Sequence, residues 1–355
     1  MKVVQVVIGL ALVVFVLRDV FLTIIVARPT ARTRWRVSIF LLRLGWPAWR
    51  RAALRRGHGW VRHAFMSVFG PLTLVTMLVL WLFFLVLGFG LALHGVKDQV
   101  SPVPGLGSAM YLAATSMLTV GFGDIVGTGG FARALTLLAA ASGLAVVTML
   151  ISLLFTLVGA FQDREEVVVV LSTRAGRPAS GVALLETYGD QGMLERLPGA
   201  FEHWEAWIAR IRETHLAYPL LFWFLSSEAN ESWVASVGAV MDASALVTAG
   251  VEGPSRGPAT MTLTTGMRLI EDMHRQVAGH AHPRHTAPDL TREDFAQAWR
   301  RLEAAGLPLR DEEEAWSAFA LLREAYVEPF SIMCAYWDIT ADPWMAPVPA
   351  PAAAA

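Results

Sequence analysis

The stretch TSMLTVGFGDIVG, residues Thr115 to Gly127, decides how the rest of the chain is interpreted. It holds two glycines separated by one residue, followed by a carboxylate, and it lies between two long apolar runs. Lipid offers no hydrogen-bond partner to irregular backbone, so such backbone at membrane depth must be buried in protein or face water. The stretch therefore predicts a loop that lines a water-filled cavity.

The apolar runs around this stretch are long enough to cross a membrane. The chain of 355 residues is 55% apolar and only 17% charged, against about 25% charged for an average soluble domain. Three segments are almost purely apolar: Val3 to Ala27, Ala64 to Leu93 and Ala134 to Phe161. Each exceeds the roughly 20 residues that a helix needs to span the hydrocarbon core. An all-α membrane protein is the expected fold class.

The first apolar run is interpreted as a retained anchor helix. An arginine-rich stretch follows it, where a secretory signal would have a small-residue cleavage site. It contains one charged pair, Arg18 and Asp19. Charges inside a membrane are often functional, but a neighbouring helix can also satisfy them, and this second interpretation is favoured. The single cysteine, Cys334, excludes an intrachain disulfide.

Charge is distributed unevenly along the chain. Residues 1–162 hold 12 Arg, 2 Lys and three acids, a net charge of +11, whereas residues 163–355 hold 15 Arg and 27 acids, a net charge of −12. Arg28 to Arg62 contains ten arginines and no acid, which places this linker in the cytoplasm and the N-terminus outside. Helical spacing of its apolar residues predicts an amphipathic helix on the inner leaflet, in contact with anionic lipid. The arginines are not repeated along one spanning helix, which argues against voltage sensing.

A segment predicted to be re-entrant leads into the stretch from Thr115 to Gly127. SAMYLAATSML, residues Ser108 to Leu118, is compatible with a helix but too short to span. Its C-terminal, partly negative end would favour a cation in the cavity. Gly121 and Gly123 can adopt left-handed dihedrals, which would let successive carbonyls face the same way and replace the hydration shell of an ion.

TVGFGD in this chain resembles the TVGYG filter loops of potassium channels, with Phe122 where tyrosine is commoner. The chain is similar, over residues 66–163, to pore-loop potassium channels of the two-transmembrane type, with one extra N-terminal helix. The resemblance implies a homotetramer that conducts K⁺ passively, without enzyme chemistry. It implies that the backbone carbonyls of a selectivity filter bind K⁺, at the positions Thr119, Val120, Gly121, Phe122 and Gly123.

The same resemblance assigns roles around the filter. Asp124, Tyr111 and Thr115 occupy the filter-supporting positions, although the last two replace the tryptophan and glutamate of well-known members. Gly143 lies where the inner helix carries its hinge glycine, and Phe155 and Gly159 lie near the cytoplasmic constriction that gates the pore. The residues expected to face the cavity are Leu144, Val147, Ile151 and Ser152. For Gly143, close helix packing remains the alternative to a hinge.

Five domains are expected from these patterns. They are an N-terminal transmembrane helix (1–27), an arginine-rich linker (28–63), a pore domain (64–162), a helical cytoplasmic domain (163–345) and a disordered tail (346–355). Within the fourth, helices are predicted at 164–174, 200–216, 231–248, 260–278, 291–305 and 311–337. Asp163 to Glu166 is expected to end the inner helix, as a stop signal or as a sensor of pH or lipid. Pro329 is expected to kink or split the last helix.

No sequence motif identifies a ligand for the predicted cytoplasmic domain. No Gly-x-Gly-x-x-Gly stretch occurs in 163–345, so a regulatory ligand is expected but not identified, and neither a cofactor besides transported K⁺ nor nucleic acid is expected. The histidines His274, His280, His282 and His285 could bind a metal, sense pH or lie in a solvated loop. The expected location is a bacterial-type inner membrane. Two alternatives stay open: a non-selective cation channel, and a membrane sensor whose cytoplasmic domain is the functional module.

Overall fold

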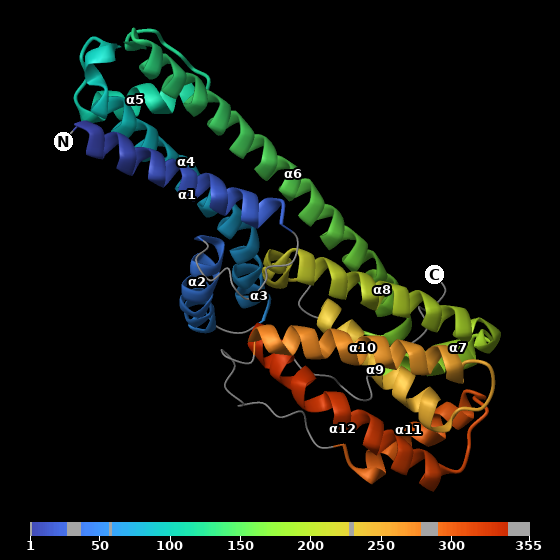
Figure 1. The fold of residues 1–355 in the computed structure, drawn as a ribbon. Coiled ribbons are helices and arrows are strands. Elements are labelled where there is room, and N and C mark those ends of the chain that lie inside the picture. The colour runs from blue at the N-terminus through green and yellow to red at the C-terminus, as the bar shows by residue number, and fades with distance from the viewer. Residues whose placement is uncertain (1, 27–36, 57–58, 227–230, 278–289, 340–355) are drawn as a thin grey trace, which may run out of the picture. The chain divides into compact units, whose positions relative to one another are not determined.

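The computed structural model describes residues 2–26, 37–56, 59–226, 231–277 and 290–339, and these fold almost entirely into helices (Figure 1). The chain divides into two compact units. The N-terminal unit comprises Met1–Gly57 and Ala64–Gly159, and the C-terminal unit comprises His58–His63 and Ala160–Ala355. Two helices, α3 (Trp60–Ser67) and α6 (Gly130–Ala175), belong to both units and connect them covalently. The expected all-α class is confirmed.

The N-terminal unit contains the expected spanning and re-entrant helices. Besides its parts of α3 and α6, its described elements are α1 (Lys2–Ile24), α2 (Val37–Leu54), α4 (Phe69–Gly95), η1 (Lys97–Gln99), β1 (Val100–Ser101), α5 (Leu106–Met117) and β2 (Val126–Gly127). Helices α1, α4 and α6 coincide with the three predicted apolar spans, and α5 coincides with the short re-entrant segment. The two strands pair antiparallel outside the helices.

Helix α1 packs lengthwise on α4 (Figure 1). Small residues bring the two backbones together, since a Cβ atom on Gly9 would lie 2.4 Å from the carbonyl oxygen of Gly88. Farther along the same contact, Asp19 is only 1% exposed, and its carboxylate accepts a hydrogen bond of 2.8 Å from the indole of Trp81. The neighbouring helix thus gives this intramembrane acid a partner, as the favoured interpretation required.

The linker between α1 and α4 contains the predicted helix α2. The ring of Trp49 stacks on Phe65 with centroids 4.3 Å apart, and its indole donates to the Phe65 carbonyl at 2.9 Å. Phe40 and Leu44 are exposed on this helix, and so is Arg51. The helix therefore presents both apolar and cationic side chains on its surface.

The sequence prediction placed the end of the inner helix too early. Helix α6 runs without a break to Ala175, through the charged residues Asp163 to Glu166 and into what was predicted as a separate helix at 164–174. Charged side chains are good helix formers and do not stop a helix. The stop comes where Gly176 takes the left-handed φ of +84° and Pro178 follows. The division between the two units falls inside this helix, after Gly159.

The C-terminal unit is a bundle of helices. Its further described elements are α7 (Gly181–Asp190), η2 (Leu194–Arg196), α8 (Leu197–Ala217), η3 (Pro219–Trp223), α9 (Trp233–Gly250), α10 (Arg256–Val277), α11 (Arg292–Ala304) and α12 (Glu312–Trp337). Five of the helices match predicted ones, whereas the short α7 was not predicted. Helix α12 is continuous through Pro329, so this proline does not split it. The predicted tail at 346–355 lies outside the described residues.

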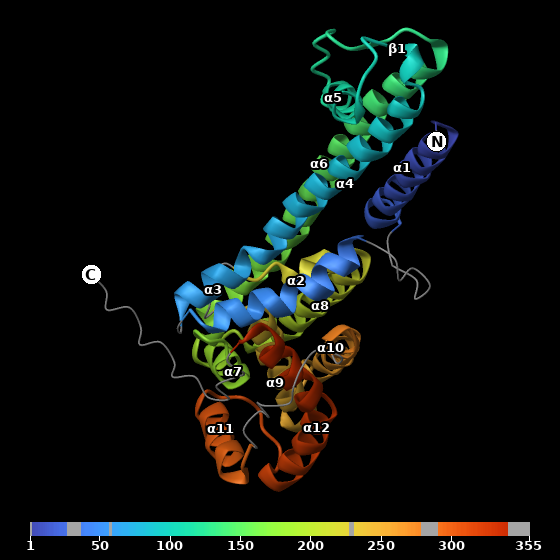
Figure 2. The ribbon, with the colours of Figure 1, turned by 90° about the vertical axis from the view of Figure 1, so that its left-hand side faces the viewer.

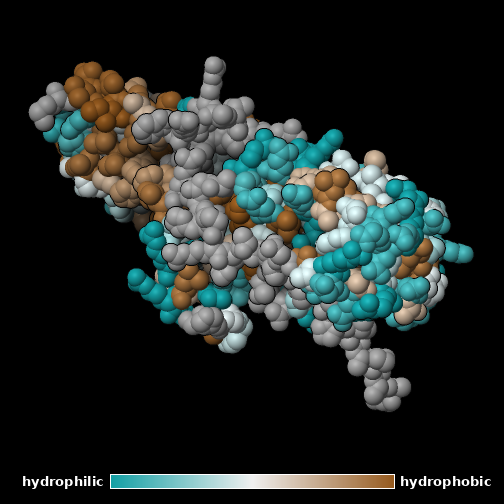
Figure 3. Space-filling model, turned by 90° about the horizontal axis from the view of Figure 1, so that it is seen from below, coloured by the Kyte–Doolittle hydropathy of each residue, from teal (hydrophilic) through white to brown (hydrophobic). Residues whose placement is uncertain are grey.

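Helix α9 lies at the centre of this bundle, among α7, α8, α10 and α12 (Figure 2). Every residue of α9 except Thr248 is buried. The helix is apolar and long enough to count as a fourth candidate membrane span, beside α1, the α3–α4 segment and α6. Because its apolar side chains are already covered by protein, α9 is the core of the bundle. The hydrophobic surface gathers over the N-terminal unit instead (Figure 3).

Candidate functional site

The loop after α5 is attached to the end of that helix by its own N–H groups. The amides of Val120 and Gly121 both donate to the carbonyl oxygen of Thr115, at 2.8 and 3.3 Å, and the amide of Thr119 donates to Ser116 at 3.0 Å. The last carbonyls of a helix have no partner within the helix, so these bonds satisfy them. The loop is thereby fixed with its N–H groups turned toward α5.

Left-handed dihedrals alternate with ordinary ones along this loop. Thr119, Gly121 and Gly123 have φ values of +56°, +55° and +80°, whereas Val120 and Phe122 between them have none of positive sign. Such alternation aligns successive peptide groups, with N–H groups on one side and carbonyls on the other. Among the described residues, no backbone hydrogen bond ends on the carbonyls from Thr119 to Gly123. The loop therefore presents a row of carbonyl oxygens that accept no backbone hydrogen bond from the described residues.

Thr119 is a strained member of this row. A β-branched residue at positive φ is a rare conformation. Dihedrals of this kind persist where the surrounding structure imposes them, and they cluster at functional sites. Here the hydrogen bonds from the loop to Thr115 and Ser116 impose the conformation.

The side chains next to the loop form a small aromatic support. The rings of Tyr111 and Phe122 are stacked nearly parallel, at 4° and 6.4 Å between centroids. The Tyr111 hydroxyl lies within electrostatic reach of the Asp124 carboxylate. The Thr115 hydroxyl instead bonds back to the Tyr111 and Leu112 carbonyls of its own helix. Of the two residues predicted to support the loop, Tyr111 contacts it through its ring and Thr115 through its carbonyl, and their supporting role stays a prediction.

Gln99 holds the C-terminal end of the loop, a role that no sequence pattern indicated. Its backbone oxygen accepts from the amides of Thr128 and Gly129, at 2.8 and 3.2 Å. Its side-chain oxygen accepts from Ala132 at 3.3 Å, at the start of α6. A glutamine in a Pro/Gly-rich loop carries no pattern from which this role could be predicted.

Helix α6 presents two different faces in the single chain. Its buried face is a heptad-like stripe that contains Leu135, Ala139, Gly143, Val146, Leu150, Leu153 and Leu157. The residues predicted for the cavity and the constriction lie mainly on the other face: Leu144 is 61% and Phe155 is 73% exposed, Ile151 and Ser152 are exposed, and Val147 and Gly159 are intermediate. Gly143 is buried, against Met117 at the end of α5.

Backbone carbonyls and apolar constrictions are the elements from which ion channels build their pores. Residues 72–160 match the family model of ion channels. The match begins within α4, covers α5 and the carbonyl loop, and ends in α6. It leaves α1, the arginine-rich linker and the C-terminal unit outside. Neither a curated protein nor a solved structure matches the chain.

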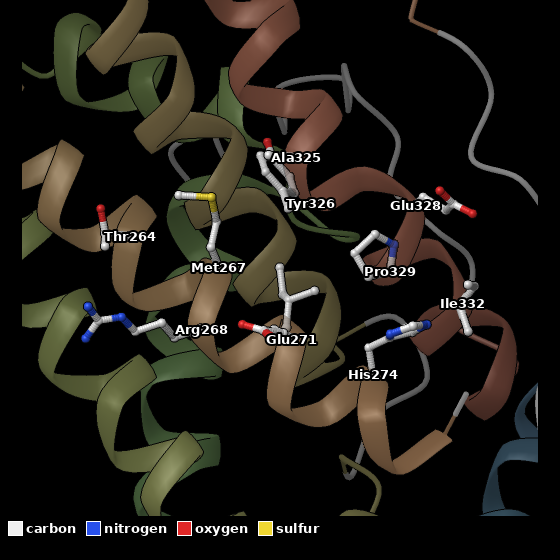
Figure 4. A pocket seen from close by; sticks show the side chains of 11 residues that line it. Thr264, Met267, Arg268, Glu271, His274, Ala325, Tyr326, Glu328, Pro329 and Ile332 are labelled. Carbon is white, nitrogen blue, oxygen red and sulfur yellow. The ribbon is translucent and has the colours of Figure 1, made fainter. Parts of the chain in front are cut away.

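The C-terminal unit has an open groove of about 560 Å³ between α10 and α12 (Figure 4). Met267 and Ile332 give it an apolar part, and Arg268, Glu271 and Glu328 give it charged ones. His274 lines its end, whereas the other predicted histidines, His280, His282 and His285, lie outside the described residues. Within the described residues, no group of three or more His, Cys, Asp or Glu is placed to hold a metal ion.

Proposed function

We propose that the protein is a potassium-selective channel that conducts passively through a pore formed by four copies of the chain. The observation that carries the proposal is the alternation of left-handed dihedrals at Thr119, Gly121 and Gly123. A row of aligned carbonyls can replace the hydration shell of K⁺. The ion-channel match over residues 72–160 supports the general function, and the intact TVGFG sequence supports the choice of ion.

The tetramer is proposed because one carbonyl row cannot surround an ion. Closed rotational symmetry is the usual solution for identical chains. The exposed face of α6, with Leu144 and Phe155, would then face the central cavity and its cytoplasmic constriction. Apolar side chains at such a constriction can close a pore by dewetting.

The proposed location is a cell inner membrane, with the N-terminus outside and the C-terminal unit in the cytoplasm. The ten arginines of the linker support this orientation. Exposed Arg51 and Arg55 on and after α2, together with exposed Phe40 and Leu44, suit an anionic lipid surface. The groove between α10 and α12 is the proposed position for a regulatory ligand. No cofactor other than the transported ion takes part.

The experiment is a recording of the purified full chain in planar bilayers with K⁺ on one side and Na⁺ on the other. The reversal potential should follow the K⁺ gradient and respond little to Na⁺. Equal permeability of the two ions would establish the non-selective alternative. Absence of any current, from protein shown to be tetrameric, would favour a sensor whose functional module is the C-terminal unit.

A further inference from the structure

One short segment of the C-terminal unit binds to both helices that connect it with the rest of the chain. The segment is Phe224 to Ser226, which follows η3 and is termed the strap. All three of its residues are buried, and Ser226 is only 2% exposed. Its partners lie on α6, after the point where that helix enters the C-terminal unit, and on the first residues of α3.

The bond to α6 is built from charged groups. The Arg164 guanidinium donates to the Phe224 carbonyl at 2.8 Å, and the Ser226 hydroxyl donates to the Glu165 carboxylate at 3.1 Å. Arg164 and Glu165 are themselves an ion pair at 2.9 Å. The strap is thus fastened to two consecutive residues of the inner helix.

Burial makes this attachment rigid. Arg164 is 2% exposed, and its guanidinium lies 5.1 and 5.2 Å from the ring centres of Phe161 and Trp233. The indole of Trp207 on α8 donates to the Arg164 backbone carbonyl at 3.2 Å. A buried charge that loses its partners is strongly disfavoured. Rotation of α6 at this point would break these bonds, so the strap and α6 must move together.

The bond to α3 is made by a histidine. The Nε2 of His63 lies 2.8 Å from the Ser226 carbonyl oxygen and must donate, because a carbonyl can only accept. Next to it, Arg62 forms an ion pair of 2.6 Å with Asp338, the left-handed residue that caps α12. Helix α4 begins at Phe69, six residues after His63. The strap is therefore attached close to the start of the outer helix.

We infer that the strap is a coupling element that makes the outer-helix base and the inner helix respond together to changes in the C-terminal unit. The inference rests on the proposed channel function, since the response it controls is opening of the pore. Helix α6 is unbroken over 46 residues, about 69 Å at 1.5 Å per residue, so a displacement at Glu165 is carried along a stiff rod toward Gly143. Ser226 belongs to both connections: its hydroxyl, together with the Phe224 carbonyl, holds α6, and its own carbonyl holds α3.

The experiment compares variants of the full chain in planar bilayers. Ser226→Ala removes the hydroxyl that donates to Glu165 and accepts from the Trp233 amide, and His63→Ala removes the bond from α3. Each should shift the ratio of open to closed channels about tenfold, within the usual range of coupling between sites. Because both connections pass through the strap, the double variant should shift the ratio by less than the sum of the two single shifts. K⁺ over Na⁺ selectivity should stay as in the parent.

The matched control is Ser244→Ala in α9. This serine is also fully buried, but its hydroxyl bonds only to Val240 of its own helix. It should leave the open-to-closed ratio unchanged. A second measurement does not depend on conduction. Hydrogen exchange of the α3 amides should become faster in Ser226→Ala and in His63→Ala, and should stay slow in the control.

The outcomes separate the two proposals. If the parent conducts but the strap variants gate as it does, the strap inference is wrong while the channel function stands. Additive effects of the two substitutions would also overturn it, because they would indicate independent contacts. If the parent carries no current, the channel function fails, and unchanged hydrogen exchange in α3 would then reject the strap separately.

Discussion

Gly143, in the N-terminal third of α6, packs directly against the carbonyl oxygen of Met117, the last residue of α5. A Cβ atom at this glycine would lie 2.4 Å from that oxygen, closer than any real contact allows. Because Met117 is followed within two residues by Thr119, the contact sets the position of the carbonyl loop relative to α6. The structure thus gives Gly143 a packing role, and its proposed role as a hinge stays a prediction.

The first prediction compares two glycines of α6. Gly143→Ala should separate α5 from α6 and abolish K⁺ current or lower tetramer stability by several kcal/mol, as overpacking does. Gly130→Ala, at the start of the same helix, is the control, because nothing lies within 4 Å of its added methyl group. Current and thermal unfolding of both variants provide the measurement. Equal behaviour of the two variants would contradict the packing role.

The second prediction concerns the dihedrals of the loop. Gly121→Ala and Gly123→Ala should each abolish selective K⁺ flux, because L-residues are disfavoured at φ of +55° and +80° by about 1–2 kcal/mol. No atom lies within 4 Å of either added methyl group, so the penalty comes from the backbone and not from a clash. Gly107→Ala in α5 is the control with open space and no positive φ. Liposome flux assays with K⁺ and Na⁺ test this, and unaltered flux in the first two variants would place the filter elsewhere.

The third prediction separates the two contacts of Tyr111. Tyr111→Phe removes the hydroxyl that interacts with the Asp124 carboxylate but keeps the ring stacked on Phe122. It should shorten the time for which the channel stays conducting, with K⁺ selectivity retained. Tyr111→Leu removes both contacts and should also reduce selectivity. Single-channel records are the measurement, and identical behaviour of the two variants would show that the hydroxyl does not contribute.

The fourth prediction is a dependence of stability on pH. Burial, together with the positive charge of Arg164, lowers the pKa of His215 from 6.5 to about 3. The folded protein therefore keeps this histidine neutral at a pH where the unfolded chain binds a proton. Stability should be complete above pH 6.5 and fall as the pH decreases toward 3, by at most about 1.4 kcal/mol per pH unit.

Thermal unfolding of the full chain, followed by tryptophan fluorescence, measures this dependence. His215→Gln keeps a polar side chain that does not titrate, so its melting temperature should vary less with pH between 6.5 and 4. A parallel pH dependence in parent and variant would assign the acid sensitivity to other groups.

The fifth prediction tests the orientation in the membrane. Cys334, the single cysteine, is buried and should give a low background. A cysteine at exposed Val103, in the loop before α5, should react with an impermeant thiol reagent added outside intact cells. A cysteine at exposed Arg51 should react only after the membrane is opened. The reverse pattern would refute the proposed topology.

The spanning helices and the carbonyl loop were predictable because they depend on local properties. Apolar runs of sufficient length define α1, α4 and α6, and the two glycines at Gly121 and Gly123 mark left-handed positions that the structure also shows. Each of these signals lies within a few residues of the feature it predicts.

What escaped prediction depends on contacts between distant parts of the chain. Arg164 and Glu165 follow an apolar run, so the sequence predicts that they form the charged end of a membrane span. In the fold, Arg164 is instead buried among aromatic rings. The role of Gln99 requires three acceptor contacts that no sequence pattern encodes. The ten-residue α7 has few periodic positions, and it is defined by the Ser180 cap and by packing against α9.

Because α6 is unbroken, the number of residues between two of its positions sets the angle about the helix axis between them. Each residue advances a helix by about 100°, so one residue inserted between Gly159 and Arg164 would turn everything beyond it by more than a quarter of a revolution. Four inserted residues would turn it by only about 40° and move it outward by about 6 Å. Insertions or deletions of about one helical turn in this segment should therefore be tolerated better than those of one or two residues. The number of residues here should be constrained more strictly than their identity.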